Sequence, residues 1–460
     1  MTAQIPLWSP MEIQLALNTS VDQSIVATGV QFNSKEIVAG DLFIALTGGK
    51  TDGHKYVSDA LDRGAVGCIV THIVEGVPPE KQIVVSDTKL ALESLARFAR
   101  MRTTAQVVAI TGSCGKTSTK EMLAACLTDQ GKTHATAKNF NNDLGIPFTL
   151  ANMPADTQYA VIEMGISHPG EMAPLSDLVR PDLTLITNIA PAHQEFFPDT
   201  TAIANEKIHI TDYQNKNGAI ILNHDDAQYQ LLADVATAVG LKKIIRFGSD
   251  EKSDIQLLHA KVHESSTEVA IRWHGETINY TLQFVGQHFA LNSLAVLAAV
   301  DALGASVEQA INTLSKLQPV SGRGQTTTIT IQGKTIHLID DAYNANPTSM
   351  AASIRTLGTH NGRLVAVLGD MLELGEKSYE MHLDMLELLA QNNIHKLYAV
   401  GPMMSRVFDL APPDLQGAKV ASALDLKETL VADLQDGDWV LFKASHSTGL
   451  DPLIQELKGA

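Results

Sequence analysis

Short β-branched runs, bounded by glycine and polar residues, recur along this chain and alternate with stretches whose apolar residues have helical spacing. This alternation predicts an α/β fold, with mostly parallel sheets covered by helices on both faces. In the middle of the chain, strands are predicted at 106–110, 159–164, 183–189, 218–223 and 243–248. A second set is predicted at 336–341, 364–370, 396–401 and 439–445.

The pattern of predicted strands and helices divides the chain into three regions. Residues 1–104 mix short strands with helical stretches and end in the amphipathic segment 90–102. The segment LQPVSGRGQ (317–325), with one proline and two glycines, predicts a hinge. For a chain of 460 residues we therefore expect three domains, 1–104, 105–320 and 321–460, the first a small α/β domain and the last Rossmann-like.

Composition and charge argue against several classes of function. With 34 Lys and Arg against 51 Asp and Glu, the formal net charge is −17, which argues against nucleic-acid binding. The sequence has no apolar run of transmembrane length, and its start lacks the basic region of a signal peptide. Cys68, Cys114 and Cys126 form neither a metal motif nor a disulfide framework. We expect a monomeric cytoplasmic enzyme without a membrane span.

A glycine-rich turn follows the first strand of the middle region, in VVAITGSCGKTSTKEML (107–123). Glycines let the backbone approach an anion, and the N–H groups and positive end of the following helix favour phosphate. Lys116 would reach the β/γ-phosphates, and the Thr117 hydroxyl would bind Mg²⁺. The predicted nucleotide contacts are Thr111, Gly112, Ser113, Cys114, Gly115, Lys116 and Thr117. The alternative is a strand-to-helix turn without a ligand.

This turn lacks the upstream glycine of the longer phosphate-loop motif and resembles that of the Mur ligases, ATP-dependent amide-forming enzymes of cell-wall precursor synthesis. Further segments that carry the resemblance include KNFNNDLGIPFTL (138–150), AVIEMGISHPGEM (160–172), ITNIAPAHQEFF (186–197), TAIANEKIHI (201–210) and GQHFALNSLAVLAA (286–299). The resemblance implies an amino-terminal domain that binds a UDP-sugar, a central ATP-binding domain and a carboxy-terminal domain that closes on ATP.

The resemblance also implies the site residues. It implies two Mg²⁺ ions, one on Thr117 and Glu163, the other on His193 and Lys207, a lysine that is carbamylated in several members. It implies His288 and Asn292 at the adenine, Asp341 at the nucleotide and Arg323 at the transferring phosphoryl group. The catalytic residues would be Lys116, His193, Lys207 and Arg323. Taken singly, these residues could instead be a solvated strand end, a structural histidine, a surface lysine or core positions.

Two segments of the last region narrow the resemblance. DDAYNANPTSM (340–350) and LGDMLELGE (368–376) resemble the branch that adds D-alanyl-D-alanine, whereas the DNPR box of the branch that adds diaminopimelate or lysine is missing from the sequence. The implied substrates are UDP-N-acetylmuramoyl-tripeptide and D-alanyl-D-alanine, joined through an acyl phosphate. The implied substrate contacts are Ser34, Lys35, Asn139, Asn141, Asn142, Tyr343, Asn344 and Asn346.

The chain departs from the family pattern at Asn33, Lys35 and His446, where aspartate, arginine and arginine are usual. Lys35 keeps the positive charge for a diphosphate but loses the planar fork of arginine. Two other functions stay open. One is a sister amide ligase on the same scaffold, of amino-acid-adding or folylpolyglutamate type. The other is a nucleotide-hydrolysing module, which would show ATPase activity without a carboxylate substrate.

Overall fold

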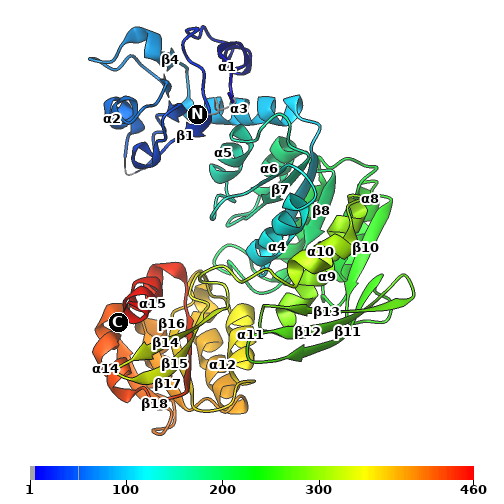
Figure 1. Ribbon diagram of the computed structural model, residues 1–460, viewed down its shortest axis with the longest axis vertical. Helices are drawn as coiled ribbons and strands as arrows, with labels where there is room; N and C mark the ends of the chain where they lie inside the picture. Colours follow the sequence, from blue (N-terminus) through cyan, green and yellow to red (C-terminus); the bar gives the residue numbers. More distant parts are fainter. Residues whose placement is uncertain (1–5, 50, 460) are drawn as a thin grey trace.

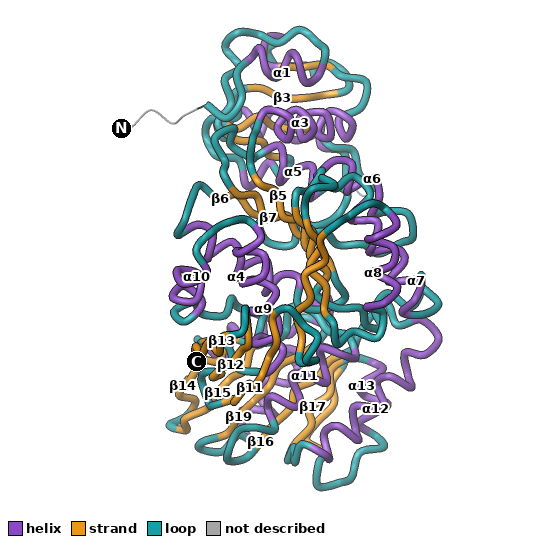
Figure 2. Tube along the Cα trace, turned by 90° about the vertical axis from the view of Figure 1, so that its right-hand side faces the viewer, coloured by secondary structure: helices purple, strands orange, loops and turns teal. Residues whose placement is uncertain are grey.

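The computed structural model describes residues 6–49 and 51–459, which form three α/β domains stacked along the longest axis of the molecule (Figure 1). Each domain has its own sheet, of four, nine and six strands. Figure 2 shows the three sheets one above the other, with helices packed beside them. The predicted α/β fold with mostly parallel sheets is therefore confirmed.

The amino-terminal domain is built on a parallel sheet in the order β1-β2-β3-β4. Helix α1 starts at a capping box, in which Ser9 and Glu12 exchange hydrogen bonds and Pro10 opens the first turn. The elements are α1 (Pro10–Leu17), β1 (Gly29–Gln31), η1 (Ser34–Glu36), β2 (Asp41–Ile44), η2 (Gly53–Tyr56), α2 (Val57–Asp62), β3 (Gly67–Val70), η3 (Pro79–Lys81), β4 (Gln82–Val84) and α3 (Thr88–Arg102).

The central sheet has the order β13-β12-β11-β10-β9-β8-β5-β7-β6. Its strands are parallel from β6 to β11, and β12 and β13 extend it as antiparallel strands. The elements are β5 (Gln106–Thr111), α4 (Lys116–Thr128), β6 (Thr133–Ala135), α5 (Gly145–Ala151), β7 (Tyr159–Glu163), α6 (Met172–Val179), β8 (Leu183–Ile186), α7 (Thr200–Lys207), η4 (Ile208–Thr211), β9 (Ala219–Asn223), α8 (Tyr229–Ala238), β10 (Lys243–Gly248), β11 (Ile255–Val262), β12 (Thr267–Trp273), β13 (Glu276–Leu282), α9 (Gln287–Ala302) and α10 (Val307–Leu314).

Helices cover both faces of this sheet, because its strands are apolar on both sides. Met122 of α4, Leu294 of α9 and Ala310 of α10 belong to the core on one face. Ile146 of α5 and Leu175 of α6 belong to the core on the other. Helix α9 is buried nearly all round.

The carboxy-terminal sheet has the order β14-β15-β19-β16-β17-β18, and only its edge strand β14 is antiparallel to its neighbour. The elements are β14 (Gln325–Ile331), β15 (Lys334–Asp340), α11 (Pro347–Leu357), β16 (Leu364–Gly369), η5 (Gly375–Lys377), α12 (Ser378–Gln391), β17 (Lys396–Val400), α13 (Pro402–Phe408), β18 (Gln416–Val420), η6 (Ala423–Leu426), α14 (Lys427–Asp433), β19 (Asp438–Lys443), η7 (His446–Thr448) and α15 (Leu450–Lys458).

The two joints between the domains differ. At the first, the side-chain amide of Asn152 pairs with both the N–H and the C=O of Val30, at 2.8 and 3.1 Å, and the indole N–H of Trp8 donates to Ala151 O at 2.9 Å. At the second, the chain passes from α10 to β14 through Gly322 and Gly324, with φ of +76° and +79°. The first joint is therefore fixed by side-chain bonds, and the second has the glycines expected of the predicted hinge.

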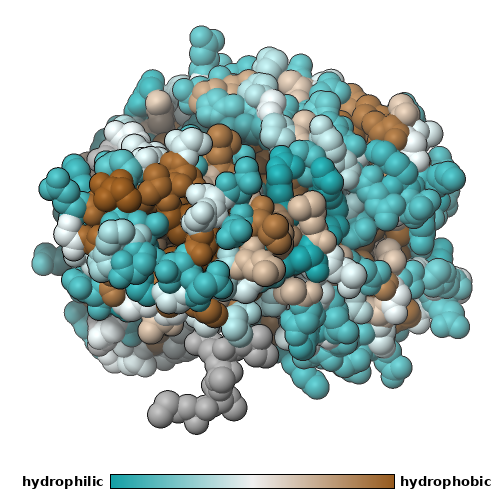
Figure 3. All heavy atoms as spheres, turned by 90° about the horizontal axis from the view of Figure 1, so that it is seen from above, coloured by the Kyte–Doolittle hydropathy of each residue, from teal (hydrophilic) through white to brown (hydrophobic). Residues whose placement is uncertain are grey.

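Seen from the amino-terminal end, the surface is mainly hydrophilic, and apolar side chains lie in separate groups among polar ones (Figure 3). Within residues 6–49 and 51–459, no helix has both the length and the apolar character needed to cross a membrane.

Candidate functional site

The predicted phosphate loop lies between the end of β5 and the start of α4. Gly112 and Gly115 have φ of +148° and +79°, which other residues rarely adopt. A Cβ on Gly112 would lie 1.9 Å from Thr187 Oγ1, so only glycine fits there. Inside the turn, Lys116 Nζ donates to Gly112 O at 2.6 Å, and burial lowers the pKa of Lys116. The turn therefore has the geometry of an anion cradle.

Sequence reasoning missed what holds this loop in shape. Asn188, in the turn after the neighbouring strand β8, accepts from Ser113 N through its backbone at 2.9 Å and from Cys114 N through its side chain at 3.0 Å. The Asp226 carboxylate accepts from Ile189 N at 2.6 Å and so holds the turn that contains Asn188. The available signal was that β5 and β8, as parallel neighbours, end at the same sheet edge.

Glu163 ends β7, the other neighbour of β5, and faces the loop. Its Oε1 accepts from Thr117 Oγ1 at 3.2 Å and from Asn141 Nδ2 at 2.7 Å. Its Oε2 is buried and has no hydrogen-bond partner among the described residues. An unpartnered buried carboxylate oxygen beside a threonine hydroxyl suits a divalent cation.

That cation would not be held by side chains alone. Within the described ranges, no group of three or more His, Cys, Asp or Glu side chains is arranged to hold a metal ion. Mg²⁺ is commonly bound by one or two carboxylates together with substrate phosphates and water. The side chains around Glu163 therefore fit Mg²⁺ that enters together with a nucleotide.

His193 and Lys207 differ in their access to the loop. His193 lines the main cavity, and its Nδ1 lies 2.5 Å from Glu373 Oε2 of the carboxy-terminal domain. Lys207 ends α7, is 1% exposed and does not line that cavity. Burial, together with the positive charge of Lys116, holds the pKa of Lys207 well below its usual value.

The start of α9 lies beside the loop, as the predicted adenine contacts require. Asn292 is close enough that a Cβ on Gly115 would meet its Oδ1 at 2.9 Å. His288 and Asp341 also line a small cavity with Phe289. Burial lowers the pKa of His288 to about 4, although the charge of Asp341 opposes that shift. The imidazole is therefore neutral near pH 7.

Residues of the carboxy-terminal domain reach the same place. The Arg323 guanidinium lies over the Tyr343 ring, 3.9 Å from its centroid. Lys443 Nζ donates to Asp341 Oδ2 at 2.7 Å and to Asn344 O at 3.1 Å, so a buried lysine fixes the turn 341–344. Asn346 caps α11, and its Nδ2 lies 3.1 Å from Cys114 Sγ in the phosphate loop.

These groups surround one cavity of about 580 Å³ between the central and carboxy-terminal domains. It brings together most of the predicted site residues: Ser113, Cys114, Gly115, Lys116, Thr117, Asn139, Asn141, Asn142, Glu163, His193, His288, Asn292, Arg323, Asp341, Tyr343, Asn344 and Asn346. Asn142 also accepts from Gly145 N at 2.9 Å at the start of α5, which is the capping role that a polar loop there would have.

Ser34 and Lys35 lie outside this cavity, in η1 of the amino-terminal domain. The next residue, Glu36, forms an ion pair with Lys138 at 3.2 Å, so η1 lies beside the start of the asparagine segment. A substrate that contacts both would extend from the amino-terminal domain towards the phosphate loop.

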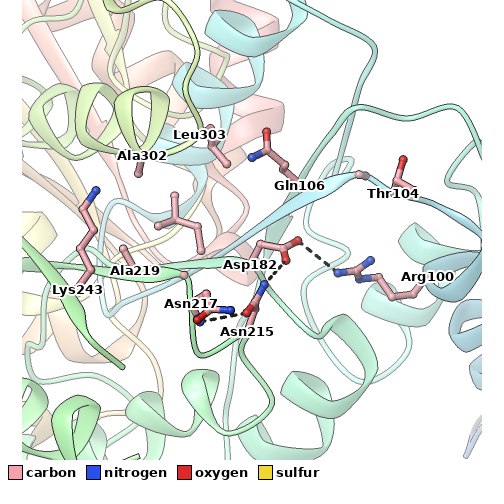
Figure 4. A pocket seen from close by; sticks show the side chains of 13 residues that line it. Arg100, Thr104, Gln106, Asp182, Asn215, Asn217, Ala219, Lys243, Ala302 and Leu303 are labelled. Atoms are coloured by element: carbon pink, nitrogen blue, oxygen red, sulfur yellow. Dashed lines mark hydrogen bonds and ion pairs between the residues drawn. The ribbon is translucent and has the colours of Figure 1, made fainter. Parts of the chain in front are cut away.

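A second cavity, of about 440 Å³, lies at the opposite edge of the central sheet, where its strands begin (Figure 4). Arg100, a partly buried cation in its lining, is already bound to Val179 O, Arg180 O and the Asp182 carboxylate. None of the predicted site residues lines it. The chemistry therefore belongs to the cavity between the domains.

Comparisons with known proteins identify the family of this chain. Residues 26–100 match the Mur ligase family catalytic domain, residues 110–300 the Mur ligase middle domain, and residues 322–446 the Mur ligase glutamate ligase domain. A curated UDP-N-acetylmuramoyl-tripeptide--D-alanyl-D-alanine ligase of Rickettsia prowazekii is 33% identical, over 97% of this chain and 99% of its own length. The ligase of the same name from Escherichia coli is 32% identical over 94% of each chain.

The solved structures most relevant here are also of Mur ligases. A crystal structure of MurF from Acinetobacter baumannii has a TM-score of 0.87 at 30% identity and covers 99% of this chain and 100% of its own. The MurF ligase of Thermotoga maritima, solved in complex with ADP, has a TM-score of 0.79 at 28% identity over 94% and 97% of the two chains. The chain belongs to the Mur ligase family.

Proposed function

We propose that this chain is an ATP-dependent ligase that joins D-alanyl-D-alanine to UDP-N-acetylmuramoyl-tripeptide, giving the pentapeptide, ADP and phosphate in the cytoplasm. The main support is the meeting of Lys116, Thr117 and Glu163 with Arg323 and Tyr343 around one cavity between two domains. The near full-length likeness to ligases named for this reaction supports the choice of substrates.

The reaction needs an activated carboxyl group, because a carboxylate is a poor electrophile towards an amine. The tripeptide carboxylate attacks the γ-phosphorus of ATP, ADP leaves, and an acyl phosphate forms. The amine of D-alanyl-D-alanine then attacks the acyl carbon, expels phosphate and loses one proton. Lys116, on one side of the cavity, and Arg323, on the other, would stabilise the charge on the transferred phosphoryl group.

Different groups of side chains would bind different parts of the substrates. Gly112 to Thr117 would hold the phosphates, while His288, Asn292 and Asp341 would contact the nucleoside. Tyr343, Asn344 and Asn346 would bind the acceptor dipeptide. Ser34 and Lys35 would bind the UDP end, and Asn139, Asn141 and Asn142 would guide the peptide carboxylate. Enclosure between two domains would keep water from the acyl phosphate.

Mg²⁺ is part of this proposal. Thr117 and Glu163 would hold one ion, whose charge would neutralise the phosphate oxygens during transfer. His193 and Lys207 would hold a second. The lowered pKa of Lys207 favours its neutral amine, which can add CO₂ and release a proton to form a carbamate, an anionic oxygen ligand.

The test is phosphate release from ATP with UDP-N-acetylmuramoyl-tripeptide, adding D-alanyl-D-alanine or single amino acids in turn. We expect turnover with the dipeptide and none with D-glutamate, diaminopimelate or lysine. Turnover with a single amino acid would indicate a sister ligase. ATP hydrolysis at the same rate with and without each acceptor would indicate a nucleotide-hydrolysing module.

A further inference from the structure

His193 and Glu373 meet across the two domains, and both have left-handed backbones, with φ of +51° and +60°. Such backbones are uncommon outside glycine and are retained where the surroundings require them. Glu195 N donates to Glu373 O at 3.4 Å, and a Cβ on Gly375 would lie 3.2 Å from Gln194 O. The segments 193–195 and 373–375 therefore dock closely, and we call this docking the 193/373 contact.

The side chains at this contact orient the imidazole. Glu373 Oε2 lies 2.5 Å from His193 Nδ1, and because a carboxylate only accepts, Nδ1 donates to it. Nε2 is left as the ring nitrogen available to a cation, and His193 lines the main cavity. Metal-binding histidines commonly have this arrangement, with one ring nitrogen bonded to a carboxylate and the other free for the metal.

Stability alone does not account for the contact. Glu373 is 48% exposed and His193 26% exposed, and ion pairs at such exposure contribute little to folding. The carboxylate nevertheless comes from the carboxy-terminal domain, while the imidazole belongs to the central one. The bond can therefore exist only when the two domains are docked.

We propose that Glu373 is a positioning residue that acts through His193. It orients the imidazole for a divalent cation and makes tight cation binding at His193 depend on docking of the carboxy-terminal domain. This inference rests on the proposed function, in which His193 holds a Mg²⁺. It adds a residue from the other domain to that site and couples the site to domain closure.

The experiment measures binding of Mn²⁺, as a paramagnetic substitute for Mg²⁺, by electron paramagnetic resonance. It uses the full chain with a non-hydrolysable ATP analogue. Glu373→Ala should weaken the His193-dependent binding by roughly 10- to 100-fold, the usual effect of losing a carboxylate behind a metal-bound histidine. Glu373→Gln, whose amide oxygen can still accept from Nδ1, should restore part of it. Glu376→Ala, which removes an exposed carboxylate just after the segment 373–375, is the matched control and should bind like the wild type.

His193→Ala separates the two levels of the proposal. If it leaves Mn²⁺ binding unchanged, the metal assignment in the proposed function is wrong. If it weakens binding but Glu373→Ala does not, the positioning role of Glu373 is wrong. In the double variant, Glu373→Ala should add nothing to His193→Ala; an additive loss would indicate a general structural effect and overturn the inference. If Glu373→Ala lowers the unfolding temperature, Glu373→Gln provides the comparison.

Discussion

The guanidinium of Arg323 donates to the hydroxyl of Thr117 at 3.0 Å, across the interface between the carboxy-terminal and central domains. It thereby reaches the end of the phosphate loop, where the γ-phosphate of ATP would lie. A cation supplied at this point stabilises charge on a transferring phosphoryl group and is worth about 10³-fold or more in kcat in related chemistry.

Arg323→Ala should therefore lower kcat for phosphate release by roughly 10³-fold. Arg323→Lys should recover only part of this loss, because lysine keeps the charge but lacks the planar fork that also stacks on Tyr343. Steady-state kinetics with all three substrates measures the effect. An alanine variant with wild-type kcat would remove Arg323 from the transfer step.

Glu163→Gln should raise the Mg²⁺ concentration needed for half-maximal turnover by at least roughly tenfold, because the free carboxylate oxygen loses its charge. The matched control is Glu171→Gln, a cavity carboxylate whose Oε2 already accepts from Ser167 N at 2.7 Å. Titration of Mg²⁺ at saturating ATP gives the comparison. Equal shifts in both variants would mean that the effect is one of general charge in the cavity.

Asn188→Ala should raise KM for ATP by about fivefold, because the loop would lose a hydrogen bond to Cys114 N worth about 1 kcal/mol. The backbone bond from Ser113 N to Asn188 O would remain, so the fold should hold. Asn188→Asp keeps the acceptor but adds a negative charge near the phosphates, so it should be worse than alanine. Calorimetry measures the affinity of each variant for ATP, which should fall from the wild type to Asn188→Ala and again to Asn188→Asp. An aspartate variant that binds ATP more tightly than the alanine variant would contradict this role of Asn188.

His360→Phe should stabilise the chain in acid. His360 stacks on Trp439 at 3.7 Å between ring centroids, and neither ring nitrogen has a hydrogen-bond partner within the described part of the chain. Burial lowers its pKa from 6.5 to about 4, so the folded state takes up this proton less readily than the unfolded state. The folding stability associated with neutral His360 is fully present above pH 6.5. It is lost as the pH falls towards 4, and the loss in the free energy of unfolding is on the order of 3 kcal/mol in all.

The measurement is the unfolding temperature between pH 7.5 and 5. His360→Phe should gain most over the wild type at the acid end. His337→Phe, which removes the other histidine stacked on Trp439, should show only a smaller acid-specific gain, because the charge of His337 is the lesser cause of the lowered pKa of His360. A gain for His360→Phe that does not depend on pH would show that packing, and not titration, is responsible.

Local patterns predicted much of the fold. The apolar run 107–110, followed by Gly112 and Gly115, predicted the strand, turn and helix at β5 and α4, because each step depends on neighbours in the sequence. The antiparallel extension was not predicted, although β12 alternates strictly enough between buried and exposed positions to be visible. β11 pairs with β12 and β12 pairs with β13, each with its neighbour in the sequence, so the missed signal was local.

The site was predictable to the extent that motifs carry it. The resemblance named Arg323 and Asn346, which the fold brings against the phosphate loop. It did not indicate the bonds of Asn188 to the loop or of Glu373 to His193. Those bonds join segments that only the tertiary structure brings together, and a left-handed backbone at Glu373 has no signal in its residue type.

Transfer of ¹⁸O tests the central claim most directly. The tripeptide carboxylate would be labelled with ¹⁸O and incubated with the enzyme, ATP, Mg²⁺ and D-alanyl-D-alanine, and the released phosphate analysed by mass spectrometry. A carboxylate oxygen that attacks the γ-phosphorus leaves with the phosphate when the amine displaces it, so each phosphate should carry one ¹⁸O. Unlabelled phosphate formed together with the pentapeptide would contradict transfer of the γ-phosphoryl group to the carboxylate.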